Sequence, residues 1–67
     1  MNELRDFGDK RTVVVYTDDR QFANRLMARK RCLKSIPYEQ GDKLVGLDFY
    51  FPKSERKNLI RMGVEEC

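Results

Sequence analysis

The strongest strand pattern in the chain is the apolar stretch Leu44-Val45-Gly46-Leu47-Asp48-Phe49-Tyr50-Phe51. Every second residue from Val45 to Phe51 shares one face of an extended strand, and the residues between them share the other. Pro52 follows directly and ends the pattern. We therefore expect residues 44–51 to be the central strand of a sheet, with Phe49 and Phe51 in the core.

The segment before this strand predicts a strand followed by a helix. Residues 12–17 are β-branched or aromatic throughout, which is typical of a half-buried strand. Asp18 is the expected helix N-cap, and Gln21 completes a capping-box pattern three residues later. We expect a helix from about Asp19 to Arg31, whose apolar arc faces the sheet and consists of Phe22, Ala23, Leu26 and Met27.

Two further elements complete the predicted fold. Residues 33–39 form a weaker strand, which Pro37 restricts to a sheet edge because proline has no N–H to donate. Ser54 is the expected cap of a short last helix with Leu59 and Ile60 on its apolar side, and Gly63 is its expected stop.

The order of these elements predicts a small two-layer α+β domain of βαββα type, with a three-stranded mixed sheet and both helices on one face. In space, we expect the strand at 44–51 to lie between those at 12–17 and 33–39. We expect residues 1–10 to be a flexible segment, residues 11–64 to be the single compact domain, and residues 65–67 to fray.

Length and cysteine usage restrict the class of protein. With 67 residues and no histidine, the chain has room for one small domain, and its stability is expected to be thin. Cys32 and the terminal Cys67 do not make a disulfide framework, and no signal peptide or apolar span precedes the domain. We therefore expect a cytoplasmic protein that does not enter a membrane.

A basic segment carries the main functional hint. Six positive charges and no negative charge lie between Arg20 and Lys34: Arg20, Arg25, Arg29, Lys30, Arg31 and Lys34. A secondary basic patch is expected on the last helix, from Lys53, Arg56, Lys57 and Arg61. Like charges four residues apart destabilise a helix slightly, so an unpaired run suggests an anionic partner. We expect this segment to bind DNA or RNA phosphates without sequence preference; a simply solvated face and an acidic protein partner are the alternatives.

Catalysis and metal binding are not expected. Without histidine or a cluster of acids, and in a domain too small to enclose a large pocket, no catalytic residue, cofactor site or metal site can be assigned. Asp18 and Asp19 suit a helix start, Asp42 suits a turn, and Asp48 is an isolated strand carboxylate. Cys32 follows a cationic turn that could lower the pKa of its thiol, but a filler role is the simpler interpretation.

The outer face of the predicted sheet suggests a second kind of contact. Val14, Tyr16 and Tyr50 would make this face too apolar for the bare surface of a monomer, so we expect a partner or a second copy to cover it. Stacking of nucleic-acid bases on Tyr16, Tyr50 and Tyr38 is a weaker alternative, because the aromatic-glycine signature of RNA-recognition strands is absent.

The competing functional hypothesis is a protein-binding module. The chain is similar in size and charge style, though not in any motif, to small proteins of phages and mobile elements, several of which inhibit host machinery. That likeness implies a regulator that docks on a larger protein through the basic helix or a sheet edge. A homodimeric scaffold is a third hypothesis.

Overall fold

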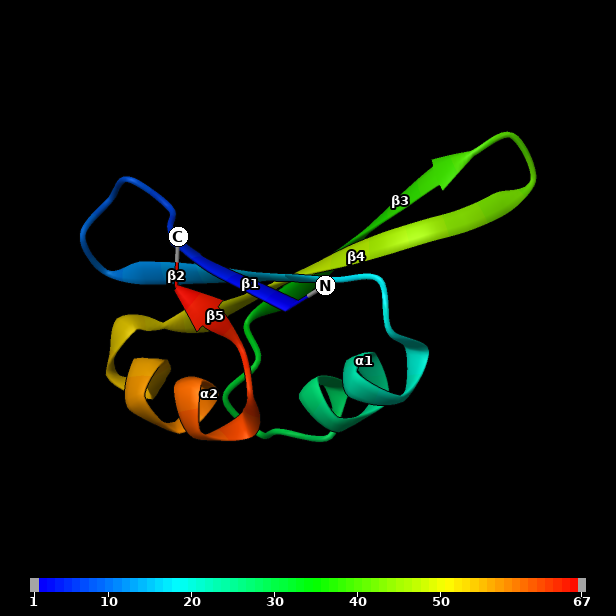
Figure 1. The fold of residues 1–67 in the computed structure, drawn as a ribbon. Coiled ribbons are helices and arrows are strands. Elements are labelled where there is room, and N and C mark those ends of the chain that lie inside the picture. The colour runs from blue at the N-terminus through cyan, green and yellow to red at the C-terminus, as the bar shows by residue number, and fades with distance from the viewer. Residues whose placement is uncertain (1, 67) are drawn as a thin grey trace.

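The computed structural model describes residues 2–66 and places two helices against one face of a sheet (Figure 1). The helices form the lower layer in this view, and the hairpin of β3 and β4 projects beyond α1. The elements in chain order are β1 (Asn2–Asp6), β2 (Thr12–Thr17), α1 (Arg20–Met27), β3 (Lys34–Gln40), β4 (Lys43–Pro52), the 3-10 turn η1 (Lys53–Glu55), α2 (Arg56–Met62) and β5 (Glu65–Glu66).

The sheet consists of four antiparallel strands in the order β3-β4-β2-β1, and the two-residue β5 pairs in parallel with β1. The α+β class and the central place of residues 44–51 are confirmed, but the three-stranded sheet was wrong. The missing strand, β1, lies in the segment that we expected to be flexible, and β5 lies in the segment expected to fray. Leu4 is the only residue of β1 that is fully buried, at 3% exposed, so the strand has little hydrophobic pattern to detect.

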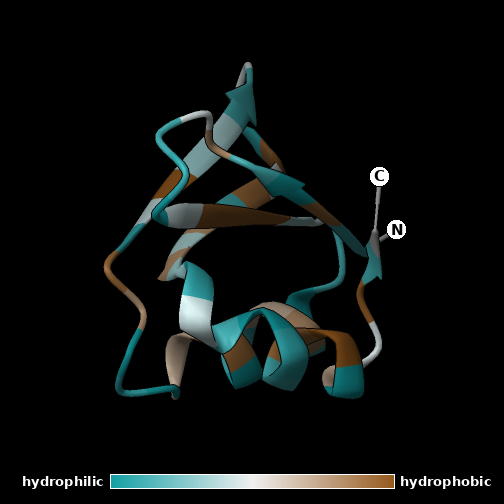
Figure 2. Cartoon of the chain, turned by 90° about the vertical axis from the view of Figure 1, so that its left-hand side faces the viewer, coloured by the Kyte–Doolittle hydropathy of each residue, from teal (hydrophilic) through white to brown (hydrophobic). Residues whose placement is uncertain are grey.

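The core lies between the sheet and the helices. Figure 2 shows these two layers from the side, with hydrophobic segments in both the strands and the helices. Phe49 and Phe51 are fully buried, as predicted, and α1 contributes Phe22, Ala23 and Leu26. Met27, which we expected in the buried arc, is 60% exposed at the last residue of α1 and lies outside the core.

The first helix begins one residue later and ends four residues earlier than predicted. Asp19, not Asp18, is the N-cap, and its Oδ1 accepts hydrogen bonds from the N–H groups of Gln21 and Phe22 at 2.9 and 3.3 Å. At the other end, the N–H of Arg29 donates to the carbonyl of Leu26, a tighter turn that terminates the α-helix.

The second helix departs from the prediction at its start and at Ile60, which was expected on the apolar side with the buried Leu59 but is 38% exposed. Residues Lys53–Glu55 form a 3-10 turn, and no side chain caps either this turn or α2, so the predicted capping role of Ser54 was wrong. The chain leaves α2 through Gly63, whose φ of 111° lies in the left-handed region. The predicted glycine stop is therefore confirmed.

Candidate functional site

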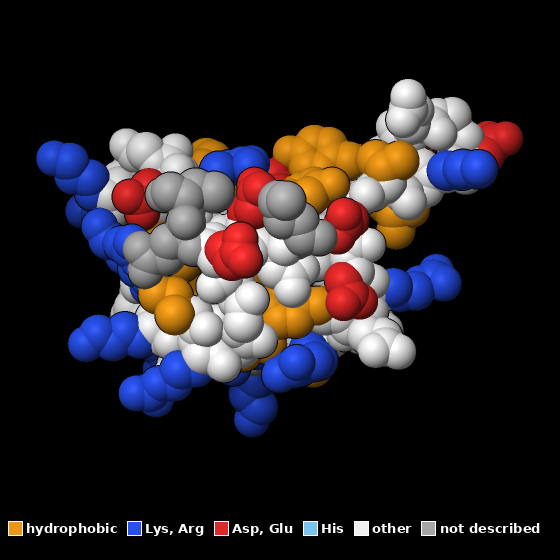
Figure 3. All heavy atoms as spheres, viewed as in Figure 1, with side chains coloured by type: hydrophobic (Ala, Val, Ile, Leu, Met, Phe, Trp, Pro, Cys, Tyr) orange, Lys and Arg blue, Asp and Glu red, His pale blue; other side chains and the backbone are white. Residues whose placement is uncertain are grey.

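Charge is divided between the two layers of the molecule. Residues 20–31 and 53–61, which include both helices, contain nine Lys or Arg and one acid, Glu55. The rest of the chain has five basic and ten acidic residues. In Figure 3, most of the blue Lys and Arg side chains lie along the lower, helical side, and most of the red acidic side chains lie higher, toward the sheet. We define the helical side, with its nine cations, as the basic face.

Glu55, the one acid of the basic face, organises the cations around it. Its residue is 5% exposed. Its Oε2 accepts a hydrogen bond of 2.6 Å from Nη2 of Arg29 and one of 3.3 Å from Nδ2 of Asn58. Its Oε1 lies 3.4 Å from Nε of Arg31. Two arginines from residues 20–34 are thus paired with an acid outside that segment. The sequence analysis did not predict this contact.

This environment changes the acidity of Glu55. The hydrogen bond from Arg29, followed by the one from Asn58, holds the pKa of the Glu55 carboxyl below its ordinary value of 4.5. The carboxylate is therefore charged at neutral pH and keeps Arg29 beside α2. Arg29 also contacts Met62, with Nη1 3.7 Å from Sδ. Arg29 thus joins the end of α1 to α2.

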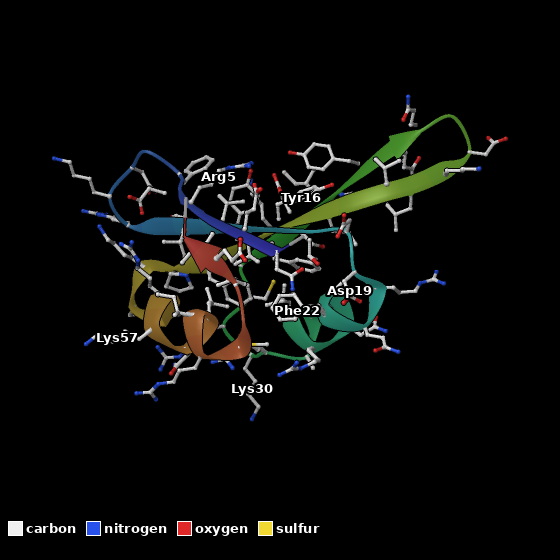
Figure 4. The ribbon with its side chains drawn as sticks, viewed as in Figure 1. Arg5, Tyr16, Asp19, Phe22, Lys30 and Lys57 are labelled. Carbon is white, nitrogen blue, oxygen red and sulfur yellow. The ribbon has the colours of Figure 1, made fainter. Side chains whose placement is uncertain are left out.

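The predicted basic residues are not equivalent in the structure. Lys30 and Lys57, labelled in Figure 4, point outward from the helical layer into solvent. Arg25 and Arg61 are also exposed. The Arg25 guanidinium lies 5.7 Å from the centre of the Phe22 ring. In contrast, only 30% of the Arg29 side chain is exposed.

The remaining cations occupy other positions. Lys34 leaves the basic face altogether: its Nζ lies 4.7 Å from the centre of the Tyr50 ring, on the outer face of the sheet. Arg20 lies at the start of α1 and lines a groove under the hairpin. In the secondary patch, Lys53 is exposed in η1. Arg56 is half-buried and interacts with another group of the protein.

The outer face of the sheet is largely covered by its own side chains. Val14 is 1% exposed although it points away from the helices. The ring of Tyr50 meets the edge of Phe7 with centroids 5.2 Å apart, and Tyr16 packs beside Tyr38 at 6.2 Å. Phe7 and Tyr38 remain 52% and 41% exposed. Tyr16 and Tyr50 therefore lie on the outer face of the sheet, where Phe7 and Lys34 pack against Tyr50; that a partner covers this face stays a prediction.

A buried carboxylate, Asp48, lies beneath this outer face. Its Oδ2 accepts hydrogen bonds from Nη2 of Arg5 at 3.0 Å and from the hydroxyl of Tyr38 at 2.6 Å, and the residue is 0% exposed. The bond to this carboxylate raises the pKa of the Tyr38 hydroxyl. Asp48 was expected to be an isolated acid, but it ties β1 and β3 to β4 across the sheet.

The other candidate residues serve local structure. Cys32 is half-buried, and this burial raises the pKa of its thiol, contrary to the lowering considered from nearby charge. Asp42 lies in the turn of the β3–β4 hairpin. Within residues 2–66, no three Cys, Asp or Glu side chains are grouped closely enough to hold a metal ion. Neither helix in this range has the length and apolar character needed to cross a bilayer.

Comparison of the chain with protein-family models, with curated proteins and with solved structures gave no match.

Proposed function

We propose that the chain is a small non-enzymatic protein that binds nucleic-acid phosphates through its basic face. The observation that carries the proposal is the separation of charge: nine cations and one acid on the helical side, against ten acids elsewhere. A surface of one sign attracts an anionic polymer even though the whole chain has a formal charge of only +3. Contacts to phosphate position a protein on nucleic acid without reading its sequence.

The cations of the basic face differ in whether they pair with Glu55. It fixes Arg29 between the helices and holds Arg31 by a longer ion pair. Arg25, Lys30, Lys57 and Arg61 form no ion pair with any residue in the described part of the chain, so they are the proposed phosphate contacts. Arg29 instead lies beneath this surface, where it contacts Glu55 and Met62. We also propose a cytoplasmic location, because a free thiol and a nucleic-acid partner both suit that compartment.

The experiment is a titration of fluorescently labelled random DNA and RNA, single- and double-stranded, with the pure protein at low and physiological salt. We expect micromolar binding at low salt, with an affinity that falls steeply as salt rises, by a slope of about 0.9 per neutralised phosphate. No binding of any of the four nucleic acids at low salt would refute the proposal.

A pair of variants with the same change of charge provides the control. Lys30→Glu combined with Lys57→Glu reverses two charges on the basic face, whereas Lys10→Glu combined with Lys43→Glu reverses two charges outside it, one in the β1–β2 loop and one at the start of β4. All four lysines are exposed. Only the first variant should lose binding; equal losses in the two variants would show that total charge, not the basic face, attracts the nucleic acid.

The alternative function, regulation of a larger protein, is favoured by a different feature. Leu44 and Val45 in the projecting hairpin are 50% and 44% exposed, beside the exposed Met27. The edge of β3 is a poorer candidate for strand addition, because Pro37 lies in the middle of that strand.

A further inference from the structure

A groove with a volume of about 550 Å³ separates α1 from the first half of β4. Ala23 and Met27 of α1 line one side, and Leu44, Val45 and Leu47 of β4 line the other. Figure 3 shows hydrophobic side chains on the underside of the projecting hairpin, above the notch beside the body of the molecule. The groove is therefore apolar on both walls.

The groove continues the face of the sheet that the helices cover elsewhere. Phe49 and Phe51, farther along β4, are fully buried beneath the helical layer. Toward the hairpin turn the same strand passes beyond α1, and its apolar residues become exposed (Figure 1). The sheet therefore offers room for a third helix beside α1, and none of the described residues fills it.

The charged side chains at the rim of the groove indicate which charge a helix bound there should carry. Arg20 on α1 and Lys43 on β4 stand on opposite walls, and neither forms an ion pair with any residue between 2 and 66. Of the two acids at the rim, Asp19 already accepts two backbone hydrogen bonds as the helix cap, and Asp18 makes an interaction of its own. The charged groups at the rim that have no partner among residues 2–66 are thus both cations, so a complementary ligand offers acidic side chains to them.

We propose that this groove binds an acidic amphipathic helix of a partner protein. The eight residues of α1 span about two turns, which matches a ligand helix with apolar anchors at positions i, i+3 or i+4, and i+7. These anchors contact Met27, Leu44 and Val45, and acidic residues beside them pair with Arg20 and Lys43. This surface is separate from the exposed cations Lys30 and Lys57, so the inference extends beyond nucleic-acid binding.

The test is an NMR titration of the 15N-labelled full chain with a synthetic peptide. The peptide is a helix of about 15 residues with leucine at the anchor positions and glutamate beside them, long enough to be partly helical alone. A second peptide replaces every glutamate with lysine. We expect saturable shifts of amides in residues 19–27 and 43–47 with the acidic peptide, and binding at least about tenfold weaker with the basic one.

Variants separate the groove from the basic face. Met27→Gln combined with Val45→Gln should weaken peptide binding at least about tenfold, whereas Ile60→Gln, at a 38% exposed apolar residue of α2, should leave it unchanged. Lys30→Glu combined with Lys57→Glu should abolish nucleic-acid binding and keep the groove shifts. Failure of either proposal is thus visible without the other.

Three outcomes would overturn the inference. The first is the absence of groove shifts, or equal binding of both peptides. The second is concentration-dependent shifts of the same amides in the protein alone, which would mean that a second copy covers the groove. The third is preferential binding of anionic lipid vesicles that broadens the groove signals, which would make the ligand a lipid surface.

Discussion

Replacing Glu55 with glutamine is expected to change stability and nucleic-acid binding in opposite directions. Glutamine has nearly the same shape and can still accept a hydrogen bond from Arg29, but its NH2 group replaces the oxygen that faces Arg31, so the charge and the Arg31 contact are lost. A charged hydrogen bond contributes about 1.5–3 kcal/mol and a neutral one about 0.5–1.5 kcal/mol. Because the side chains of Arg29 and Arg31 are 30% and 66% exposed, solvent screening places the loss near the low end, at about 1 kcal/mol. For a domain of this size, that lowers Tm by about 4–8 °C.

The same substitution should strengthen binding to nucleic acid. It removes the only acid of the basic face and weakens the ion pairs that hold Arg29 and Arg31 away from phosphate. One unit charge at about 7 Å in water contributes about 0.6 kcal/mol, so we expect roughly threefold tighter binding at low salt. If either arginine then neutralises a phosphate, the salt slope rises by about 0.9.

The assay is thermal unfolding followed by circular dichroism, together with anisotropy titrations over a range of salt concentrations. Glu39→Gln is the matched control, since it changes the net charge equally on the exposed β3–β4 hairpin and breaks no ion pair within residues 2–66. We expect little change in Tm or salt slope for this control. Weaker nucleic-acid binding by Glu55→Gln with the fold intact would refute the reasoning, because the Glu55 pairs would then be needed to present the cations.

The pH dependence of stability provides an independent check on Glu55. Its pKa is lowered in the folded state by Arg29 and Asn58, so its contribution is fully present above the ordinary value of 4.5 and is lost as pH falls through the lowered pKa. We therefore expect the difference in unfolding free energy between the natural chain and Glu55→Gln to be constant near pH 7 and to shrink below about 4.5. A difference that grows on acidification would contradict the pairing.

Three other substitutions test the fold. Gly46→Ala places a Cβ 2.6–2.7 Å from ring atoms of Tyr16, and we expect a loss of about 1–3 kcal/mol in denaturant unfolding that largely disappears when Tyr16 is also changed to Ala. Gly63→Ala puts a side chain at φ 111°, and the Tm should fall by several degrees. Tyr38→Phe removes one of the two donors to the buried Asp48 and should cost about 1–2 kcal/mol; an unchanged unfolding free energy would show that water replaces the hydroxyl.

The elements with a strong hydrophobic pattern could be predicted from the sequence. β2 is β-branched or aromatic throughout, the apolar residues of β4 alternate, and the α1 arc of Phe22, Ala23 and Leu26 is buried as expected. β1 could not be found in the same way, because Leu4 is its only fully buried residue and its neighbours are polar or charged. Its place between β2 and β5 comes from backbone pairing, which the side-chain pattern of one short segment does not encode.

The end of α1 was misjudged for a tertiary reason. The segment after Met27 has good helix formers, and local propensity alone would continue the helix. In the structure, Arg29 turns toward Glu55, which is 26 residues farther along the chain. An ion pair between segments so far apart leaves no local signal, so the sequence could identify the basic residues without showing which of them is held inside.

Glu55 and Asp48 show how the two layers use buried acids differently. Each is almost inaccessible to solvent and receives an arginine, but Asp48 joins three strands on the acidic side of the molecule, whereas Glu55 lies among cations. A carboxylate within the proposed phosphate-binding surface would oppose the ligand, and the link that Glu55 makes between the end of α1 and α2 accounts for its place there. Glu55 therefore lowers the positive potential of the basic face while it fixes the position of one helix relative to the other. Its remaining exposed cations are then presented from a rigid layer rather than from independent helices.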